Sequence, residues 1–276
     1  MNRRHFLKAA AAGAAAGTLV PRWLGAAAPS RATRLGPIGI QLHTVRREMA
    51  RDVEQALAMI AGIGYREVEF AGLFNHSARD VRAMLDRHGL VAPSSHVAVP
   101  DRDDDWKRAL DDAVTLGQSW IVCPWIDEKD RTADGYKRVA ARFNWAAQAA
   151  KDAGLQFAYH NHDFEFKPIN GRPAFDLLLA ECDASLVKME MDIFWLVNGG
   201  QDPLDYLARY PGRFPMLHVK DRSADGRMVD VGAGVIPFGK IFAQAHASHY
   251  FVEHDEPADA MASARASYAW LRKLEF

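Results

Sequence analysis

The sequence predicts an α/β fold, a single-domain (β/α)8 TIM barrel, on three observations. After residue 34, short apolar runs typical of buried parallel strands alternate with stretches of helical hydrophobic spacing. Eight such strand–helix units fit into about 240 residues, the usual size of this fold. Nearly every predicted strand ends in a titratable or metal-ligating residue, and such barrels carry their active sites at those ends. We therefore expect one barrel domain over residues 34–276.

A doubly wound open sheet is the main alternative for this alternation of strands and helices. No Gly-x-Gly-x-x-Gly turn follows the first predicted strand, which weakens that alternative. The sequence after residue 34 contains no linker-like or low-complexity stretch, so we expect no division into further domains.

The elements of the first half follow from hydrophobic spacing and capping residues. Residues 38–43 predict the first strand. Ser77 predicts the N-cap of a helix that runs through Leu85 and ends at Gly89. The other predicted elements are helices over 52–63, 106–116 and 132–153, and strands over 68–70, 91–97, 120–124 and 155–160.

The second half repeats this rhythm. Asp202 predicts the N-cap of a helix that begins at Pro203, a residue favoured in the first helical turn. The predicted helices cover 174–181, 203–210, 237–246 and 258–274, and the predicted strands cover 186–192, 214–220 and 250–253.

Composition and charge indicate an ordinary globular protein. Of 276 residues, 49% are apolar and 25% charged, with a formal net charge of −1. No basic run follows the N-terminal segment, which argues against a nucleic-acid partner. The two cysteines, Cys123 and Cys182, have no metal-binding spacing, so we expect reduced or buried thiols.

Residues 1–27 are expected to form an export signal. Arg3 and Arg4 precede Phe-Leu-Lys and an apolar stretch over 9–20 that is too short to span a bilayer. This pattern resembles a twin-arginine signal peptide, which implies the twin-arginine translocation machinery as a partner and a periplasmic or otherwise exported location. We predict cleavage after Ala27 and no stable membrane span in the mature form. Cleavage removes four basic residues and no acidic one, which moves the net charge from −1 to −5.

A dense polar cluster follows the fifth predicted strand. In Tyr-His-Asn-His-Asp-Phe-Glu-Phe, residues 159–166, His160 and His162 are two positions apart and point the same way if the strand continues. A polar loop with hydrogen-bonded histidines explains this cluster equally well when it is taken alone.

The ends of the other strands favour a functional site over that explanation. Random placement would leave most strand ends apolar or simple turns. The residues at the predicted ends are instead His43, Glu69, His96, Trp125, His160, Asp192, His218, Lys220 and Glu253.

Several motifs resemble those of the xylose isomerase-like TIM-barrel superfamily, often described as sugar phosphate isomerases/epimerases. They are Gly-Tyr-Arg-Glu-Val-Glu-Phe at 64–70, the cluster at 159–166, Met-Asp-Ile-Phe-Trp at 191–195, Leu-His-Val-Lys-Asp at 217–221, Val-Gly-Ala-Gly at 231–234 and Val-Glu-His-Asp at 252–255. The resemblance covers essentially the whole mature chain. It is specific for the family and weak for the substrate.

The resemblance implies one divalent metal ion held by Glu, Asp, His and Glu from the ends of strands five to eight. Asp192, His218 and Glu253 match this pattern, while His160 stands where the family's epimerases have glutamate. A site of two imidazoles and two carboxylates suits Mn, Zn, Co or Fe better than Ca or Mg. Asp255, which has the same strand parity as Glu253, is the substitute ligand.

Roles for the remaining residues are hypotheses of the same kind. Glu253 is the candidate base, with Glu69, His96 and Lys220 as catalytic partners; a salt bridge or structural hydrogen bond is the alternative for each of these three. Asp221 is expected to form a structural ion pair. Candidate substrate contacts are His43, Trp125, His162 and Trp195.

The predicted function is that of a metal-dependent sugar isomerase or epimerase that abstracts a proton next to a carbonyl. A lyase or hydratase acting on 3-keto sugars or glycosides is the alternative. It is favoured by His160 in the glutamate position and by export, since phosphorylated sugars are scarce outside the cytoplasm. A non-catalytic sugar-binding barrel is the alternative of another class. An endonuclease IV-like repair enzyme is disfavoured by the absence of a basic surface and by the export signal.

Overall fold

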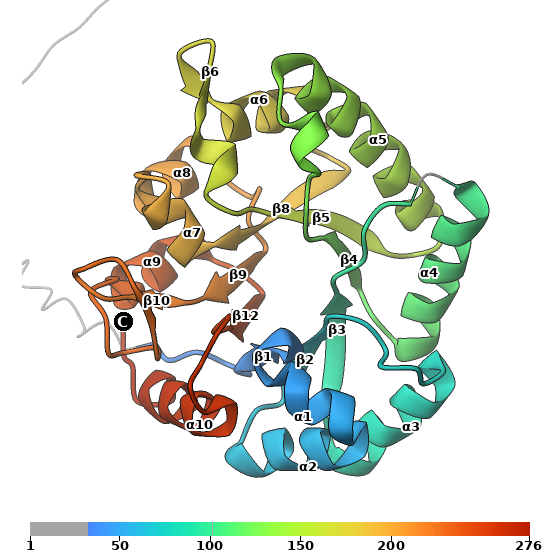
Figure 1. The fold of residues 1–276 in the computed structure, drawn as a ribbon, viewed down its shortest axis with the longest axis vertical. Helices are drawn as coiled ribbons and strands as arrows, with labels where there is room; N and C mark the ends of the chain where they lie inside the picture. The colour runs from blue at the N-terminus through green and yellow to red at the C-terminus, as the bar shows by residue number, and fades with distance from the viewer. Residues whose placement is uncertain (1–32, 101) are drawn as a thin grey trace, which may run out of the picture. The chain divides into compact units, whose positions relative to one another are not determined.

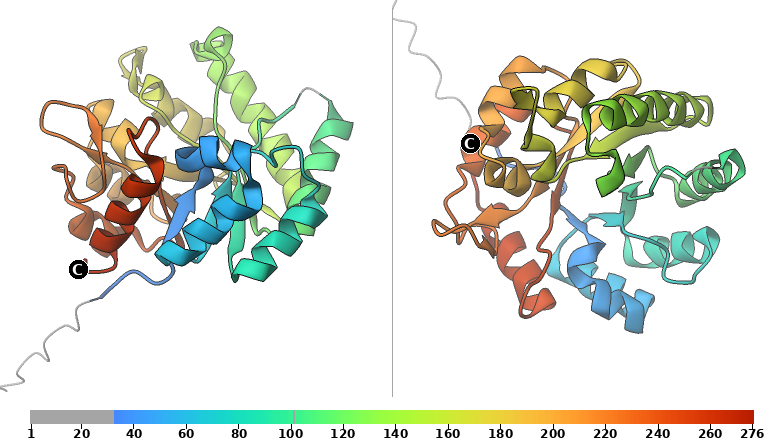
Figure 2. Two further views of the ribbon diagram at one scale, coloured as in Figure 1. Left: turned by 60° about the horizontal axis from the view of Figure 1, so that its bottom comes forward. Right: turned by 45° about the horizontal axis from the view of Figure 1, so that its top comes forward.

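A computed structural model describes residues 33–100 and 102–276 of the chain. The predicted signal segment, residues 1–27, lies outside the described residues. Figures 1 and 2 show a ring of central strands surrounded by helices, the barrel that the sequence predicts. No helix in the described ranges is both long and apolar enough to cross a membrane.

Eight strands form one parallel sheet in the order β3-β2-β1-β12-β9-β8-β5-β4. Their bounds are β1 Gly39–Gln41, β2 Glu67–Phe70, β3 Val91–Ser95, β4 Trp120–Cys123, β5 Gln156–His160, β8 Val187–Asp192, β9 Met216–Val219 and β12 His249–Val252. Each of the eight predicted strands is confirmed, with ends that shift by a few residues.

The helices pack outside the strands (Figure 1). They are α1 Arg46–Arg51, α2 Val53–Ile63, α3 Ala78–His88, α4 Asp103–Leu116, α5 Ala133–Asp152, α6 Ala174–Glu181, α7 Ile193–Asn198, α8 Pro203–Arg209, α9 Phe238–Ala245 and α10 Ala260–Leu271. Short 3-10 turns cover η1 Leu42–Val45, η2 Glu128–Asp130 and η3 Phe164–Phe166. Two hairpins, β6 Pro168–Ile169 with β7 Arg172–Pro173 and β10 Asp221–Arg222 with β11 Met228–Val229, project from the loops.

The predicted caps are confirmed by hydrogen bonds. The Ser77 hydroxyl accepts from the Asp80 N–H at 3.1 Å, and Gly89 ends α3 in the left-handed conformation with φ of 63°. The Asp202 carboxylate accepts from the Leu204 N–H at 2.8 Å at the start of α8. Helices α1 and α7 are additions to the predicted elements.

The join between β3 and β4 closes the barrel with few hydrogen bonds. It consists of an isolated bridge between His96 and Val122, with the Val97 N–H donating to Val122 O at 2.8 Å and the Ser119 N–H donating to Pro93 O at 3.0 Å. Pro93 has no N–H to offer on the side of β4, and the register between β2 and β3 shifts by one residue before Ser94.

The interior of the barrel is apolar in its lower part and polar in its upper part. Trp120, Val122, Ala158, Met216 and Phe251 form the apolar cluster inside the ring. Gly39 is required beside it, because an added Cβ would lie 2.5 Å from the Phe251 ring. Toward the carboxyl ends of the strands, the buried residues include the polar or charged Gln41, Glu69, His160, Glu190, Asp192 and His218.

Asp221 holds the loop after β10 by accepting four hydrogen bonds from backbone N–H groups, and among the described residues it makes no ion pair, contrary to the prediction. Its carboxylate accepts from Arg222 at 2.8 Å, Gly232 at 2.8 Å, Gly234 at 2.9 Å and Ile236 at 3.3 Å. This corrects the ion-pair prediction: the motif at 231–234 supplies N–H donors that satisfy the carboxylate without a cation.

The two ends of the described barrel are bonded to each other. The Thr33 N–H donates to Phe276 O at 2.8 Å, and the Phe276 N–H donates back to Thr33 O at 3.0 Å. Cys123 and Cys182 are free and buried, as expected.

Candidate active site

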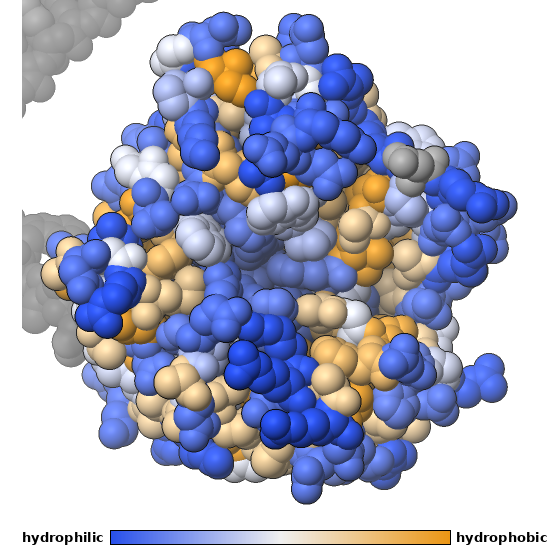
Figure 3. All heavy atoms as spheres, in the orientation of Figure 1, coloured by the Kyte–Doolittle hydropathy of each residue, from blue (hydrophilic) through white to orange (hydrophobic). Residues whose placement is uncertain are grey.

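A cavity of about 560 Å³ opens where the carboxyl ends of the strands meet. Figure 3 shows this hollow near the centre of the face, with hydrophilic residues inside it. The lining residues are His43, Ala71, His96, Pro124, Trp125, His160, His162, Asp163, Phe164, Trp195, Lys220, Glu253 and Asp255.

Four ligand-type side chains converge at the base of this cavity; His160 and Glu253 line it, while Asp192 and His218 are fully buried behind the lining. His160 ends β5, Asp192 ends β8, His218 lies on β9 and Glu253 follows β12, and one donor atom from each lies within 4.8 Å of every other. All four are buried. The alternation of strand residues turns them inward together, because parallel strands of a barrel place their ends around one axis.

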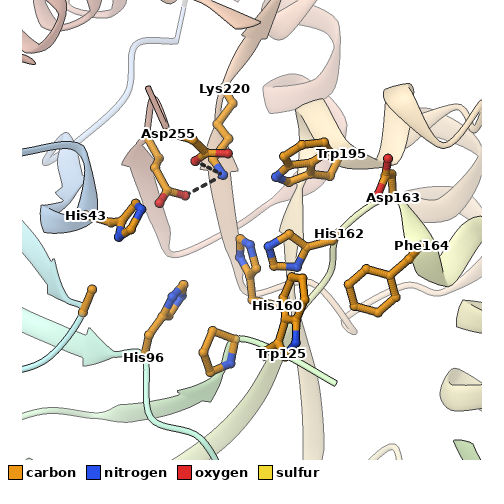
Figure 4. A pocket seen from close by; sticks show the side chains of 13 residues that line it. His43, His96, Trp125, His160, His162, Asp163, Phe164, Trp195, Lys220 and Asp255 are labelled. Carbon is orange, nitrogen blue, oxygen red and sulfur yellow. Dashed lines mark ion pairs between the residues drawn. The ribbon is translucent and has the colours of Figure 1, made fainter. Parts of the chain in front are cut away.

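Lys220 pairs with two carboxylates of this group and with Asp255, which lies beside it in Figure 4. Its Nζ is 2.9 Å from Asp192 Oδ2, 2.7 Å from Glu253 Oε2 and 2.8 Å from Asp255 Oδ1. Burial opposes the charge of Lys220, but the three carboxylates outweigh it and raise the pKa well above its ordinary value. Lys220 and its three carboxylate partners together have a formal charge of −2, which a divalent cation would neutralise.

The pKa values of the two acidic ligand-type residues, Asp192 and Glu253, are shifted in opposite directions. Burial raises the pKa of Asp192 to about 6, against the effect of Lys220 and His218. Burial also opposes the ionisation of Glu253, but Lys220 and His218 outweigh it and hold the pKa of Glu253 well below its usual range. Glu253 is therefore a carboxylate at neutral pH.

The donor set of the floor fits a divalent transition metal. Two imidazoles and two carboxylates converge from four strands, and the surrounding charge is negative. A second group of possible ligands lies deeper and shares two histidines with the first: His96, His160, Glu190 and His218.

Glu190 is a buried residue of the site that the sequence reasoning missed. Its Oε2 lies 2.9 Å from His96 Nε2, 3.1 Å from His160 Nδ1 and 3.0 Å from His218 Nε2. A readable signal existed, because Glu190 has the same strand parity as Asp192 on β8 and alternates with Met189 and Met191.

Glu69 belongs to this deeper network and does not line the cavity. It is fully buried, and its Oε2 lies 2.7 Å from His218 Nε2, 3.1 Å from His96 Nε2 and 2.7 Å from Gln41 Nε2. Burial opposes the charge of His96, but Glu69 and Glu190 raise its pKa to about 9. Burial likewise opposes the ionisation of Glu69, and the two histidines more than compensate and lower its pKa.

Aromatic side chains form one wall of the cavity. The Trp125 ring centre lies 4.8 Å from that of His162 and 5.0 Å from that of Phe164, and the His162 ring lies 5.8 Å from Trp195. Trp125 is 48% exposed, an unusual position for a large aromatic ring. Phe194, which precedes Trp195, is buried, does not line the cavity and packs edge-on against the Trp195 ring at 4.9 Å.

Polar atoms within this wall are available to a ligand. Among the described residues, His162 Nδ1 and Trp195 Nε1 are buried and have no hydrogen-bond partner. Burial, with Lys220 as the next contribution, lowers the pKa of His162 to about 3, so its imidazole is neutral at ordinary pH.

A buried carboxyl holds the loop that carries His162. Glu165 accepts from the His162 N–H at 2.9 Å and from the Tyr159 hydroxyl. Burial raises the pKa of Glu165 to about 7 although Tyr159 lowers it.

The structure thus brings most of the predicted site residues to one cavity. Among the predicted catalytic and substrate-binding residues, only Glu69 is absent from the lining. His43 lines the cavity from η1, because β1 ends at Gln41, whose side chain accepts from the His43 N–H at 3.0 Å. Asp163 also lines the cavity and was not among the predicted site residues.

Two family models match this chain. The model described as xylose isomerase-like TIM barrel matches residues 57–274, and the twin-arginine translocation signal model matches residues 1–20. The chain accordingly carries a twin-arginine signal and is exported by that pathway.

Curated relatives match a smaller part of the chain than the xylose isomerase-like family model does. An inosose dehydratase of Geobacillus kaustophilus is 25% identical over 194 residues, which is 61% of this chain and 61% of that protein. An inosose dehydratase of Clostridium beijerinckii is 31% identical over 90 residues, 33% of this chain and 30% of that protein. The chain therefore spans about three fifths or less of the length of these relatives.

Solved structures match nearly the whole barrel. A sugar phosphate isomerase/epimerase from Parabacteroides distasonis has 29% identity and a TM-score of 0.77, covering 89% of this chain and 96% of that one. A 3-keto-D-glucoside 4-epimerase from E. coli has 18% identity and a TM-score of 0.61, covering 87% and 100%, which shows the shared fold alone.

Proposed function

Because the chain belongs to the xylose isomerase-like TIM barrel family, we propose that it is a metal-dependent enzyme that removes a proton next to a carbonyl group of a sugar. The family and its relatives support a sugar isomerase/epimerase or a dehydratase, and so an enzyme in preference to a non-catalytic sugar-binding barrel. The observation that carries the proposal is the convergence of His160, Asp192, His218 and Glu253 at the base of a cavity that has an aromatic wall and that two of them, His160 and Glu253, line.

The metal would be held by these four side chains. Their mixture of imidazole and carboxylate suits Mn, Zn, Co or Fe. When bound, a divalent ion supplies Lewis acidity, which polarises the carbonyl and lowers the free energy of the enediolate.

Glu253 is the proposed base. Its carboxylate lines the cavity, is ionised at neutral pH, and is held in place by His218 Nδ1 and Lys220 Nζ, each 2.7 Å from Oε2. Lys220 adds a buried positive charge at the same place, which favours negative charge on a substrate oxygen. Trp125 and Trp195 offer ring faces against which a sugar ring packs.

Elimination is the outcome that this site favours. Epimerisation by two opposed carboxylates lacks one partner, since His160 stands where the second glutamate would be. In elimination, Glu253 takes the proton from carbon, a carbon–oxygen bond at the next carbon breaks, and the departing oxygen takes a proton. His96 lines the cavity and has a pKa of about 9, so its imidazolium can give that proton. A keto sugar or keto-glycoside that loses water or an alcohol fits these roles.

The test is exchange of solvent deuterium into a keto sugar, followed by NMR with metal occupancy measured in parallel. Glu253→Gln should keep the fold and lower proton exchange by roughly 10²-fold or more, because the amide is a poor base. Glu67→Gln is the control, because Glu67 pairs with His249 Nδ1 at 2.9 Å at the opposite end of the barrel. Wild-type exchange in metal-loaded Glu253→Gln protein would contradict the proposal. An unsaturated product identifies elimination, and an inverted centre identifies epimerisation.

A further inference from the structure

We propose that Glu190 is a positioning residue that fixes the tautomers of His160 and His218, so that each imidazole directs a lone pair at the proposed metal. The inference rests on the metal site of the proposed function. Glu190 itself lies beneath that site, is fully buried and is absent from the cavity lining.

Both histidines direct one ring nitrogen at Glu190, but His160 does so with Nδ1 and His218 with Nε2. His160 directs Nδ1 at Glu190 Oε2, 3.1 Å away, and Nε2 toward Asp192 Oδ2, 3.7 Å away. His218 directs Nε2 at Glu190 Oε2, 3.0 Å away, and Nδ1 at Glu253 Oε2, 2.7 Å away. In each ring, one nitrogen faces the deep carboxylate and the other faces the cavity floor.

Hydrogen-bond chemistry then selects the tautomer. A neutral imidazole carries one N–H and one lone pair, and an ionised carboxylate accepts hydrogen bonds without donating them. Glu190 therefore favours the N–H on Nδ1 of His160 and on Nε2 of His218. On His160 the nitrogen left with a lone pair is Nε2, which faces the proposed metal. On His218 the surrounding carboxylates raise the pKa well above its usual value, so Nδ1 holds a proton in the metal-free chain and offers its lone pair once a metal displaces that proton.

Glu190 is better placed for this role than Glu69. Both carboxylates contact His218, and in the part of the chain that the structure describes only Glu190 lies within hydrogen-bonding distance of His160 as well. His96 Nε2 lies 2.9 Å from Glu190 Oε2 and supplies a cationic partner, which a fully buried carboxylate needs.

Glu190 is also a possible metal ligand in the deeper group of His96, His160 and His218. Both groups use His160 and His218, through opposite ring nitrogens. Simultaneous occupation would require each ring to lose both of its protons and bridge two ions. Three ring nitrogens lie within 3.1 Å of Glu190 Oε2, at hydrogen-bonding distances, which argues for a hydrogen-bonded support beneath a single ion.

The test is Glu190→Gln in the full chain, with Glu67→Gln as the matched control for removing a buried carboxylate that pairs with a histidine. The first readout is the tautomer of the histidines in metal-free, ¹⁵N-histidine-labelled protein. At His160 and His218, wild type and Glu67→Gln should give the same signals, and Glu190→Gln should change them. The second readout is affinity for Co²⁺ and Zn²⁺ by chelator competition, which should fall 10–100-fold in Glu190→Gln alone.

The outcomes separate this inference from the proposed function. Unchanged tautomers and unchanged metal affinity in Glu190→Gln overturn the positioning role. Two ions in wild type and one in Glu190→Gln also overturn it, because Glu190 would then be a ligand. A wild-type chain that binds no ion, with tautomers that still shift in Glu190→Gln, defeats the metal-dependent function and leaves the positioning role standing. If Glu190→Gln folds poorly, Glu190→Asp, which keeps the charge and shortens the reach, should bind metal more weakly than wild type; wild-type affinity there overturns the role.

Discussion

Lys220 Nζ lies 2.7 Å from Glu253 Oε2, so a buried ammonium shares the carboxylate that we assign to the metal and to the proton. The ammonium and a divalent ion are both drawn to the same negative group. In the absence of an ion, Lys220 is the principal positive charge beside Asp192, Glu253 and Asp255.

Lys220→Met should destabilise the metal-free protein and strengthen its response to metal. Removing one partner of a buried ion pair costs about 3–5 kcal/mol, and the bare carboxylates then attract a divalent ion more strongly. Thermal unfolding with and without Mn²⁺ or Co²⁺ should show a larger metal-induced rise in Tm for the variant than for wild type. An equal rise in both proteins would show that the ammonium and the ion do not share these carboxylates.

Asp192→Asn should lose the metal and keep the fold. Asp192 Oδ1 accepts from the Trp195 N–H at 2.8 Å and caps α7, and asparagine caps a helix about as well. Elemental analysis should find one divalent ion per wild-type chain and little in the variant. Asp202→Asn, which changes the equivalent cap of α8 away from the cavity, should retain the ion. Full occupancy in Asp192→Asn would remove this residue from the ligand set.

Trp125→Ala should raise KM for a sugar substrate by roughly 10-fold with a smaller effect on kcat. The ring is 48% exposed at the cavity wall, and its loss removes about 1–2 kcal/mol of apolar contact with the substrate. Trp145→Ala is the control, because Trp145 is 38% exposed on α5 and does not line the cavity. Equal KM values for the two variants would place the sugar elsewhere.

Glu165 should make the protein less stable as the pH rises from about 4.5 to about 7. Its pKa is raised from 4.5 to about 7 in the folded chain, so over this interval the folded state holds a proton that the unfolded state has released. The contribution is fully present below pH 4.5 and is lost as pH passes 7, with a size of about 3 kcal/mol. Denaturant unfolding of wild type and Glu165→Gln at pH 5 and pH 8 measures it. The same pH dependence in both proteins would assign the effect to other groups.

Replacing both Arg3 and Arg4 by lysine should leave the protein in the cytoplasm, because the export machinery distinguishes the guanidinium pair from ammonium groups. Cell fractionation followed by immunoblotting gives the answer. Arg22→Lys, a change outside the twin-arginine pair, should be exported normally. Periplasmic accumulation of the double variant would contradict a twin-arginine requirement.

The sequence predicted those site residues whose positions follow from their place at the end of a strand. Asp192, His218 and Glu253 were predicted together because strand ends in a barrel converge, whatever the details of packing. Glu190 was not, because the prediction considered the ends of strands, and Glu190 lies two residues before the end of β8, where only its parity with Asp192 indicates that it faces the axis. Glu69 was placed at the rim, while its depth depends on the stagger of β2, which only the sheet register defines.

Among the local elements, too, some could be predicted from the sequence and others could not. The caps at Ser77 and Asp202 were predicted because a side chain and a nearby N–H suffice to form them. Helix α7 was not, because residues 193–197 are uniformly apolar and have no polar face to mark a helical period.

The paired hydrogen bonds between Thr33 and Phe276 have a practical consequence. Both ends of the barrel leave it at one point, and neither residue belongs to the cavity lining. A tag or a surface linker attached at either end therefore leaves the cavity residues unaltered. Because the ends already touch, a very short peptide can join them, and the chain can be reopened in an exposed loop as a circular permutant.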